Sequence, residues 1–167
     1  MRKNIKGKLP IRPTSNKVVQ AIFNILYSVK DKRFLDLFAG TGQVGITALK
    51  KGASEVVFVE LDRERAMDIS QNCRKLGYTE KIKIFPIDVL KFLDNEGDQV
   101  YDIVFADPPY DYKYYDKLIG QSLRVLRKGG IFILEHRYNL DFKEKFPEGL
   151  YDERVYGDTK LTFWRKE

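Results

Sequence analysis

Five short apolar runs, separated by segments of helical periodicity, restrict the folds open to this sequence. The runs are Phe34–Phe38, Glu55–Glu60, Lys81–Ile87, Tyr101–Ala106 and Ile131–Glu135. Between them, helices are predicted at Val44–Lys51, Arg63–Leu76, Leu90–Leu93 and Tyr114–Leu126, the last ended by Gly129-Gly130. Strands that alternate with helices in this way predict an α/β fold, with a mostly parallel sheet covered by helices on both faces.

Both ends of the chain depart from this rhythm. Tyr151–Tyr156 and Leu161–Trp164 are strand-like and are separated by a turn-forming segment, which predicts a closing antiparallel hairpin and a sheet of seven strands. Residues 1–13 are basic and contain two prolines, which favours an extended arm. A helix capped by Thr14 or Ser15 follows. We expect one domain over residues 1–167, with the basic arm and the helix at residues 1–30.

Composition limits the environment and the chemistry. Cys73 is the single cysteine, so the chain can form no internal disulfide and no cysteine-based metal site, and we expect a cytoplasmic protein without a metal. No apolar run approaches the ~18 residues of a membrane span, and a monomer is favoured. The formal charge of +6 favours a polyanionic partner such as a nucleic acid.

A glycine loop follows the first predicted strand. Gly40, Gly42 and Gly45 satisfy the G-x-G-x-x-G pattern between a strand and a helix, and Glu60 lies at the spacing of about 20 residues typical of a ribose-binding acid. The pattern predicts a cofactor that contains a nucleoside. A nicotinamide dinucleotide would use the same glycines, so the loop alone leaves the cofactor open.

Asp36 favours one cofactor over the other. Its carboxylate would repel a pyrophosphate but attract the ammonium group of an amino acid, and S-adenosyl-L-methionine carries an ammonium, a ribose and no phosphate. Phe38 lies in the same loop, and Asp88 at the end of the third strand could meet the adenine amine or could cap the next helix. Asp62 is expected to cap the helix that begins near Arg63.

A second motif, Asp107-Pro108-Pro109-Tyr110, follows the fourth predicted strand. Ligands bind at the carboxyl ends of strands in open α/β sheets. The Asp107 carboxylate and the Pro108 carbonyl can accept hydrogen bonds from the two protons of an aromatic amine, and Tyr110 can stack on its ring. These residues predict the site at which such an amine is activated.

Together these segments resemble class I S-adenosylmethionine-dependent methyltransferases. Phe34 to Gly45, Glu60, Asp88 and Asp107 to Tyr110 carry the resemblance. The closer similarity is to RsmD-like enzymes, on Arg12-Pro13-Thr14, Phe23 to Leu26, and Tyr156 to Thr159. The resemblance implies a Rossmann-like fold and methylation of a guanine N2 in 16S ribosomal RNA, by the guanine(966)-N(2) reaction.

An RNA substrate requires contacts to its backbone, because the target base must be splayed from its stack. The candidates are Arg2, Lys3 and Arg12 in the basic arm, and Tyr112 and Lys113 after the proline motif. We expect the partner to be ribosomal RNA within the small subunit or an assembly intermediate. Adenine-N6 methylation of DNA or RNA, an NAD-dependent oxidoreductase and an inactive RNA-binding module are the alternatives.

Overall fold

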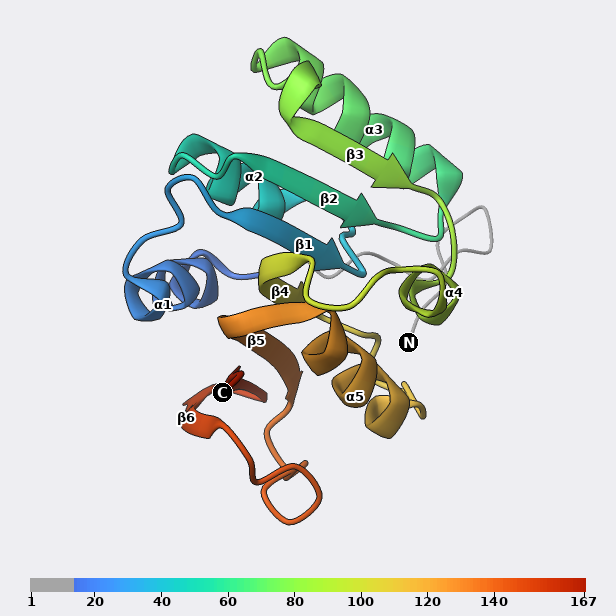
Figure 1. The fold of residues 1–167 in the computed structure, drawn as a ribbon. Coiled ribbons are helices and arrows are strands. Elements are labelled where there is room, and N and C mark those ends of the chain that lie inside the picture. The colour runs from blue at the N-terminus through green and yellow to red at the C-terminus, as the bar shows by residue number, and fades with distance from the viewer. Residues whose placement is uncertain (1–13) are drawn as a thin grey trace.

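The computed structural model describes residues 14–167 (Figure 1). Its helices are α1 (Asn16–Leu26), α2 (Gln43–Lys50), α3 (Arg63–Lys75), the 3₁₀ turn η1 (Thr79–Lys81), α4 (Val89–Asp94) and α5 (Tyr115–Val125). Its strands are β1 (Arg33–Leu37), β2 (Glu55–Val59), β3 (Ile82–Phe85), β4 (Tyr101–Ala106), β5 (Leu126–Arg137), β6 (Leu150–Tyr156) and β7 (Thr159–Arg165).

The strands form one seven-stranded sheet in the order β3-β2-β1-β4-β5-β7-β6. Neighbouring strands from β3 to β5 are parallel, whereas β7 is antiparallel to both β5 and β6. The chain turns from β6 into β7 at Gly157-Asp158. The predicted parallel sheet with a closing antiparallel hairpin is therefore confirmed.

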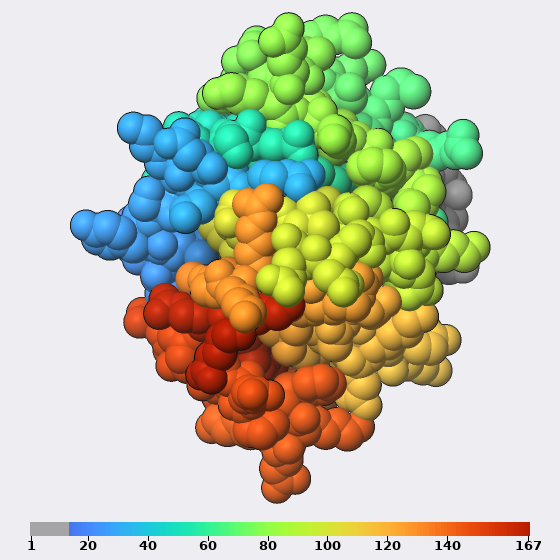
Figure 2. All heavy atoms as spheres, in the orientation of Figure 1, coloured from blue at the N-terminus to red at the C-terminus, as the bar shows by residue number. Residues whose placement is uncertain are grey.

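Helices cover both faces of the sheet, also as predicted. One apolar core joins α1, α2 and α3 to side chains such as Phe34, Phe58 and Phe105, and the other joins α4 and α5 to Val104, Phe132 and other side chains. In Figure 2 the β3–α3 edge lies at the top and the segments around β6 at the bottom. None of the helices within residues 14–167 has the length and apolarity that a membrane span requires.

Several predicted boundaries differ from the structure, two of them for a clear physical reason. Helix α5 ends at Val125, and Gly129-Gly130, expected to end it, lie within β5. The reason is a tertiary contact: the backbone of Lys166 bonds to Gly129 and Gly130, while its Nζ donates to the carbonyls of Arg124 and Leu126. Strand β3 is also shorter than predicted, because Pro86 directly after Phe85 lacks a backbone donor.

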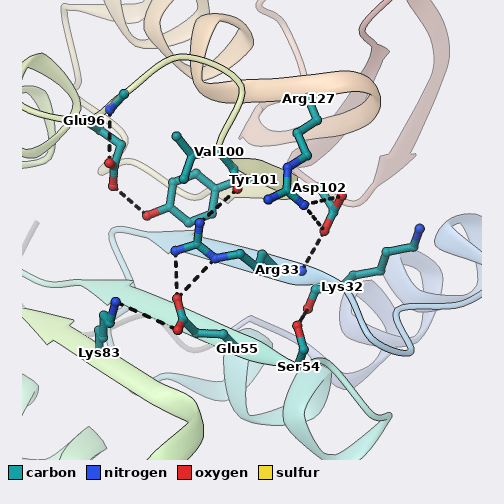
Figure 3. A network of polar contacts seen from close by, with 11 residues as sticks. Lys32, Arg33, Ser54, Glu55, Lys83, Glu96, Val100, Tyr101, Asp102 and Arg127 are labelled. Carbon is teal, nitrogen blue, oxygen red and sulfur yellow. Dashed lines mark hydrogen bonds and ion pairs between the residues drawn. The ribbon is translucent and has the colours of Figure 1, made fainter.

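A network of polar side chains joins the amino ends of β1, β2 and β4, away from the carboxyl ends of these strands (Figure 3). The Arg33 guanidinium donates to Glu55 Oε1 at 2.8 Å through Nη2 and to the Val100 carbonyl at 3.1 Å through Nη1. The backbone N–H of Arg33 donates to Asp102 Oδ2 at 2.8 Å. The side chain of Arg33 thus links three segments that are distant in sequence.

We expect Arg33→Met to lower the free energy of unfolding by about 1–3 kcal/mol, because it leaves half-buried acceptors without their donor. Urea denaturation measures this change. Lys83→Ala is the matched control, since Lys83 lies 3.9 Å from the same carboxylate with its side chain 60% exposed. That variant should lose no more than about 0.5 kcal/mol. Equal losses in the two variants would contradict the role given to Arg33.

Candidate active site

The glycine loop and the proline motif meet in one pocket at the carboxyl ends of β1 and β4. The pocket is lined by Thr14, Asp36, Phe38, Ala39, Gly40, Thr41, Gln43, Val44, Phe105 and Asp107. Strands β1 and β4 are adjacent and parallel, with Leu37 paired to Ala106, so the residues after them emerge side by side. The sheet topology therefore unites two motifs that are about 70 residues apart in the sequence.

The structure explains why glycine stands at each of these three positions of the loop. Gly40 and Gly42 have φ angles of 61° and 79°, a left-handed conformation that favours glycine, and Gly42 is the N-cap of α2. Gly45 has a different role, because a Cβ there would lie 2.4 Å from Cε1 of Phe58. Glycine at this position lets α2 pack closely on the sheet, so that its first turn lies beside the pocket.

Asp36 is a buried carboxyl group on the pocket wall, with only 1% of its surface exposed. Its Oδ2 accepts a hydrogen bond from the backbone N–H of Gly45 at 3.0 Å. Burial raises the pKa of Asp36 to about 8; the Gly45 hydrogen bond opposes this rise and the nearby Glu60 carboxylate adds to it. A cation that approaches Asp36 would therefore favour the ionised form of its carboxyl group.

Glu60 is tied to the backbone of the glycine loop. Its Oε1 accepts from the N–H of Gly40 and its Oε2 from the N–H of Asp62, both at 2.8 Å. Each carboxylate oxygen has a second lone pair, so Glu60 can still accept a hydroxyl proton. Asp62 is the N-cap of α3, as predicted.

Asp88 and Tyr112 lie near each other, and Tyr112 contacts Phe38 of the glycine loop. Asp88 caps α4, its Oδ2 accepting from the N–H groups of Leu90 and Lys91. The Tyr112 ring packs edge-on against Phe38, with their centroids 5.2 Å apart. Burial raises the pKa of Tyr112 to about 12, and the Asp88 carboxylate adds to that rise. Tyr112 thus supports the glycine loop from the side of the proline motif.

In the proline motif, Asp107 lines the pocket, Pro108 is buried and Tyr110 is half-buried. The guanidinium carbon of Arg137 lies 4.7 Å from the Tyr110 ring centroid. Burial raises the pKa of the neighbouring Tyr115 to about 12; the Asp107 carboxylate adds to the rise and Arg137 opposes it. Asp107, Tyr115 and Arg137 are therefore neighbours beside the pocket.

Two residues near the end of β5, Glu135 and Arg137, lie beside the proline motif and were not among the predicted site residues. Ala106 pairs with Leu134, so Glu135 lies in β5 at the level at which Asp107 follows β4. Glu135 is 4% exposed, and its Oε2 accepts from the Thr159 hydroxyl at 3.2 Å. The available signal was the position of Glu135 and Arg137 at the carboxyl end of a predicted strand.

His136 has a structural role. Its Nδ1 lies 2.8 Å from the carbonyl oxygen of Arg137, which can only accept, so Nδ1 carries the proton. Its Nε2 then accepts from the Thr162 hydroxyl at 2.7 Å. Burial lowers the pKa of His136 to about 4, so the ring is neutral at pH 7.

The predicted RNA-contact residues divide into two groups. Arg2, Lys3 and Arg12 lie outside the described residues. Lys113 is exposed on the loop that follows the pocket, whereas Tyr112 is half-buried by its ring contacts. Within residues 14–167, no group of three or more His, Cys, Asp or Glu side chains is arranged to hold a metal ion.

The sheet order, the antiparallel C-terminal strands and the glycine loop after β1 define the class I methyltransferase fold. Residues 3–165 match the family model described as Conserved hypothetical protein 95, and the chain belongs to that family.

Known proteins of similar sequence and structure agree with this assignment. YlbH of Bacillus subtilis, named as a candidate rRNA methyltransferase, is 29% identical over 165 residues, covering 93% of this chain and 88% of its own. Ribosomal RNA small subunit methyltransferase D of Buchnera aphidicola is 28% identical over 142 residues, covering 79% and 74%. The solved structure of yhhF of Escherichia coli, named as a candidate methyltransferase, superposes with a TM-score of 0.82 at 25% identity, covering 94% and 88%.

Proposed function

We propose that this protein is an S-adenosyl-L-methionine-dependent methyltransferase that acts on the exocyclic N2 amine of a guanine in 16S ribosomal RNA. The observation that carries the proposal is that Asp36, Gly40 and Asp107 line a single pocket. A cofactor loop and an amine-binding motif thereby share one space. The names of the relatives YlbH and methyltransferase D support the ribosomal RNA substrate.

The residues at the glycine loop fit S-adenosyl-L-methionine. Asp36 would hold the ammonium group, Glu60 would accept from the ribose hydroxyls, and the open turn at Gly40 and Gly42 leaves room for the ligand beside the backbone. Asp88 would meet the adenine amine with the carboxylate oxygen that does not cap α4. The bound cofactor supplies an activated methyl group on a sulfonium with a neutral leaving group.

The proline motif would hold the target base. The Asp107 carboxylate and the Pro108 carbonyl would accept hydrogen bonds from the two N–H groups of the amine, which localises the nitrogen lone pair as that nitrogen becomes tetrahedral. These hydrogen bonds strengthen as positive charge develops on the nitrogen, so they stabilise the transition state more than the ground state. Tyr110 would stack on the base, a contact worth ~1–3 kcal/mol.

RNA contacts outside the pocket are assigned to the basic arm residues Arg2, Lys3 and Arg12 and to Lys113, which extends into solvent. Tyr112 is half-buried and its ring packs against Phe38, so only its exposed part is a candidate for contact with RNA. These residues would hold the RNA backbone while the target base leaves its stack.

Transfer of a labelled methyl group from S-adenosyl-L-methionine to small ribosomal subunits that lack the modification tests the proposal. Digestion to nucleosides should give labelled N2-methylguanosine, and mapping the labelled position tests the guanine(966)-N(2) assignment. Free 16S RNA and assembly intermediates, measured in parallel, identify the form of the substrate. Labelled N6-methyladenosine would instead support adenine methylation.

Ligand binding separates the remaining alternatives. S-adenosylhomocysteine should raise the melting temperature and NAD should not, because a ligand stabilises only the state that binds it. The reverse result would favour an oxidoreductase. Binding of S-adenosylhomocysteine and RNA without any methyl transfer would indicate an RNA-binding module.

A further inference from the structure

Arg137 stands out among the charged side chains at the carboxyl edge of the sheet. It is the last residue of β5 and pairs with Thr159 of β7. Strand β5 is the neighbour of β4, whose end leads into the proline motif (Figure 1). The Arg137 guanidinium packs over the ring of Tyr110, at 4.7 Å from its centroid.

The ion pairs elsewhere in the structure show how Arg137 differs from several other arginines. Arg33, Arg124, Arg127 and Arg154 each pair with an aspartate or glutamate. Within the part of the chain that the structure describes, Arg137 forms no ion pair with an acidic side chain, and it is exposed. Its charge is therefore available to an external anion.

The geometry of this pair suits an RNA strand. The guanidinium carbon lies over the Tyr110 ring and no acidic side chain of the described residues pairs with the group, so its N–H groups can bind a phosphate through two parallel hydrogen bonds. Arg137 covers one face of Tyr110, so a base that stacks on this ring would meet its opposite face. A nucleotide that enters in this way brings its own phosphates close to the same arginine.

We propose that Arg137 positions Tyr110 for base stacking and binds a phosphate of the RNA strand beside the methylated nucleotide. The proposal rests on the RNA methyltransferase function given above and adds a residue to its substrate side. Arg137 acts on the reaction through Tyr110 and through the RNA backbone, whereas Asp107 and Pro108 contact the reacting amine.

The test compares Arg137→Met and Arg137→Lys with the wild-type protein on unmodified small subunits over a range of salt concentrations. Arg137→Met should raise KM at least tenfold. It should also reduce the slope of log(kcat/KM) against log[salt] by about 0.7–0.9, the contribution of one phosphate contact. Arg137→Lys should restore the slope but only part of the KM, because an ammonium keeps the charge without the planar group.

Arg165→Met is the matched control. The Arg165 guanidinium also lies over a tyrosine, 5.2 Å from the Tyr151 centroid, but Arg165 pairs with Ile131, far from the carboxyl end of β5. This variant should match the wild type in KM and in salt slope. S-adenosylhomocysteine affinity, measured by calorimetry, should stay within about twofold of wild type in all three variants, because none of these residues lines the cofactor pocket.

Two results would overturn the inference alone. The first is an Arg137→Met variant with the KM and the salt slope of the wild type. The second is an Arg137→Met variant with a lower kcat but an unchanged salt slope, because an unchanged slope would show that Arg137 does not contact a phosphate. Absence of methyl transfer to RNA by the wild-type protein is a different outcome. It would refute the proposed function, and the inference with it.

Discussion

Asp107→Ala is expected to lower kcat/KM for methyl transfer by at least about 10²–10³-fold, the usual loss when one group that stabilises developing charge is removed. The reason is that the carboxylate would accept a hydrogen bond from the target amine and would interact most strongly when that nitrogen becomes positive. Methyl transfer to small subunits measures kcat/KM. Calorimetric titration with S-adenosylhomocysteine should give an affinity within about threefold of wild type.

Asp111→Ala provides the control for this substitution. Asp111 carries the same carboxylate four residues further along the chain but is exposed and does not line the pocket. Its removal should leave both measurements close to wild type. If Asp107→Ala lost cofactor affinity and methyl transfer in equal proportion, Asp107 would belong to the cofactor site instead of the substrate site.

The parts of the site that the sequence predicted are those encoded in continuous segments. The conformation of the glycine loop can be predicted from its sequence, because Gly40 and Gly42 have left-handed backbone angles that favour glycine. Gly45 is required because a Cβ at this position would collide with Phe58. The prolines after Ala106 end β4 in the same local way. The predicted parallel sheet places both motifs at one edge, and the adjacency of β1 and β4 in the structure brings them into one pocket.

The parts that the sequence did not predict depend on contacts between distant segments. Glu135 gains its place from the register of β5 beside β4 and from the Thr159 hydroxyl on β7. The stacking of Arg137 on Tyr110 and the end of α5 near Lys166 have the same origin. Periodicity reports which residues are buried, but it does not report which strand lies next to which.

Asp36 leads to the second large effect, a dependence of cofactor affinity on pH. In the free protein its pKa is about 8, chiefly because burial disfavours the charged form, so at pH 7 most molecules carry a neutral carboxyl group. The ligand's ammonium favours the carboxylate, so binding lowers this pKa and releases a proton. Affinity for S-adenosylhomocysteine should therefore rise about tenfold from pH 6 to 7 and about 50-fold from pH 6 to 8, and then level off.

Calorimetry from pH 6 to 8.5, in buffers that differ in ionisation enthalpy, measures both the affinity and the proton released. Asp36→Asn keeps an oxygen for the Gly45 N–H but cannot ionise, so its affinity should be independent of pH and about 50-fold below the wild-type value at pH 8. The ligand 5′-methylthioadenosine lacks the amino acid group, so its affinity should not vary with pH in either protein. A pH dependence shared by this ligand would show that the titrating group does not face the ammonium, because only a charge beside the amino acid group can distinguish the two ligands.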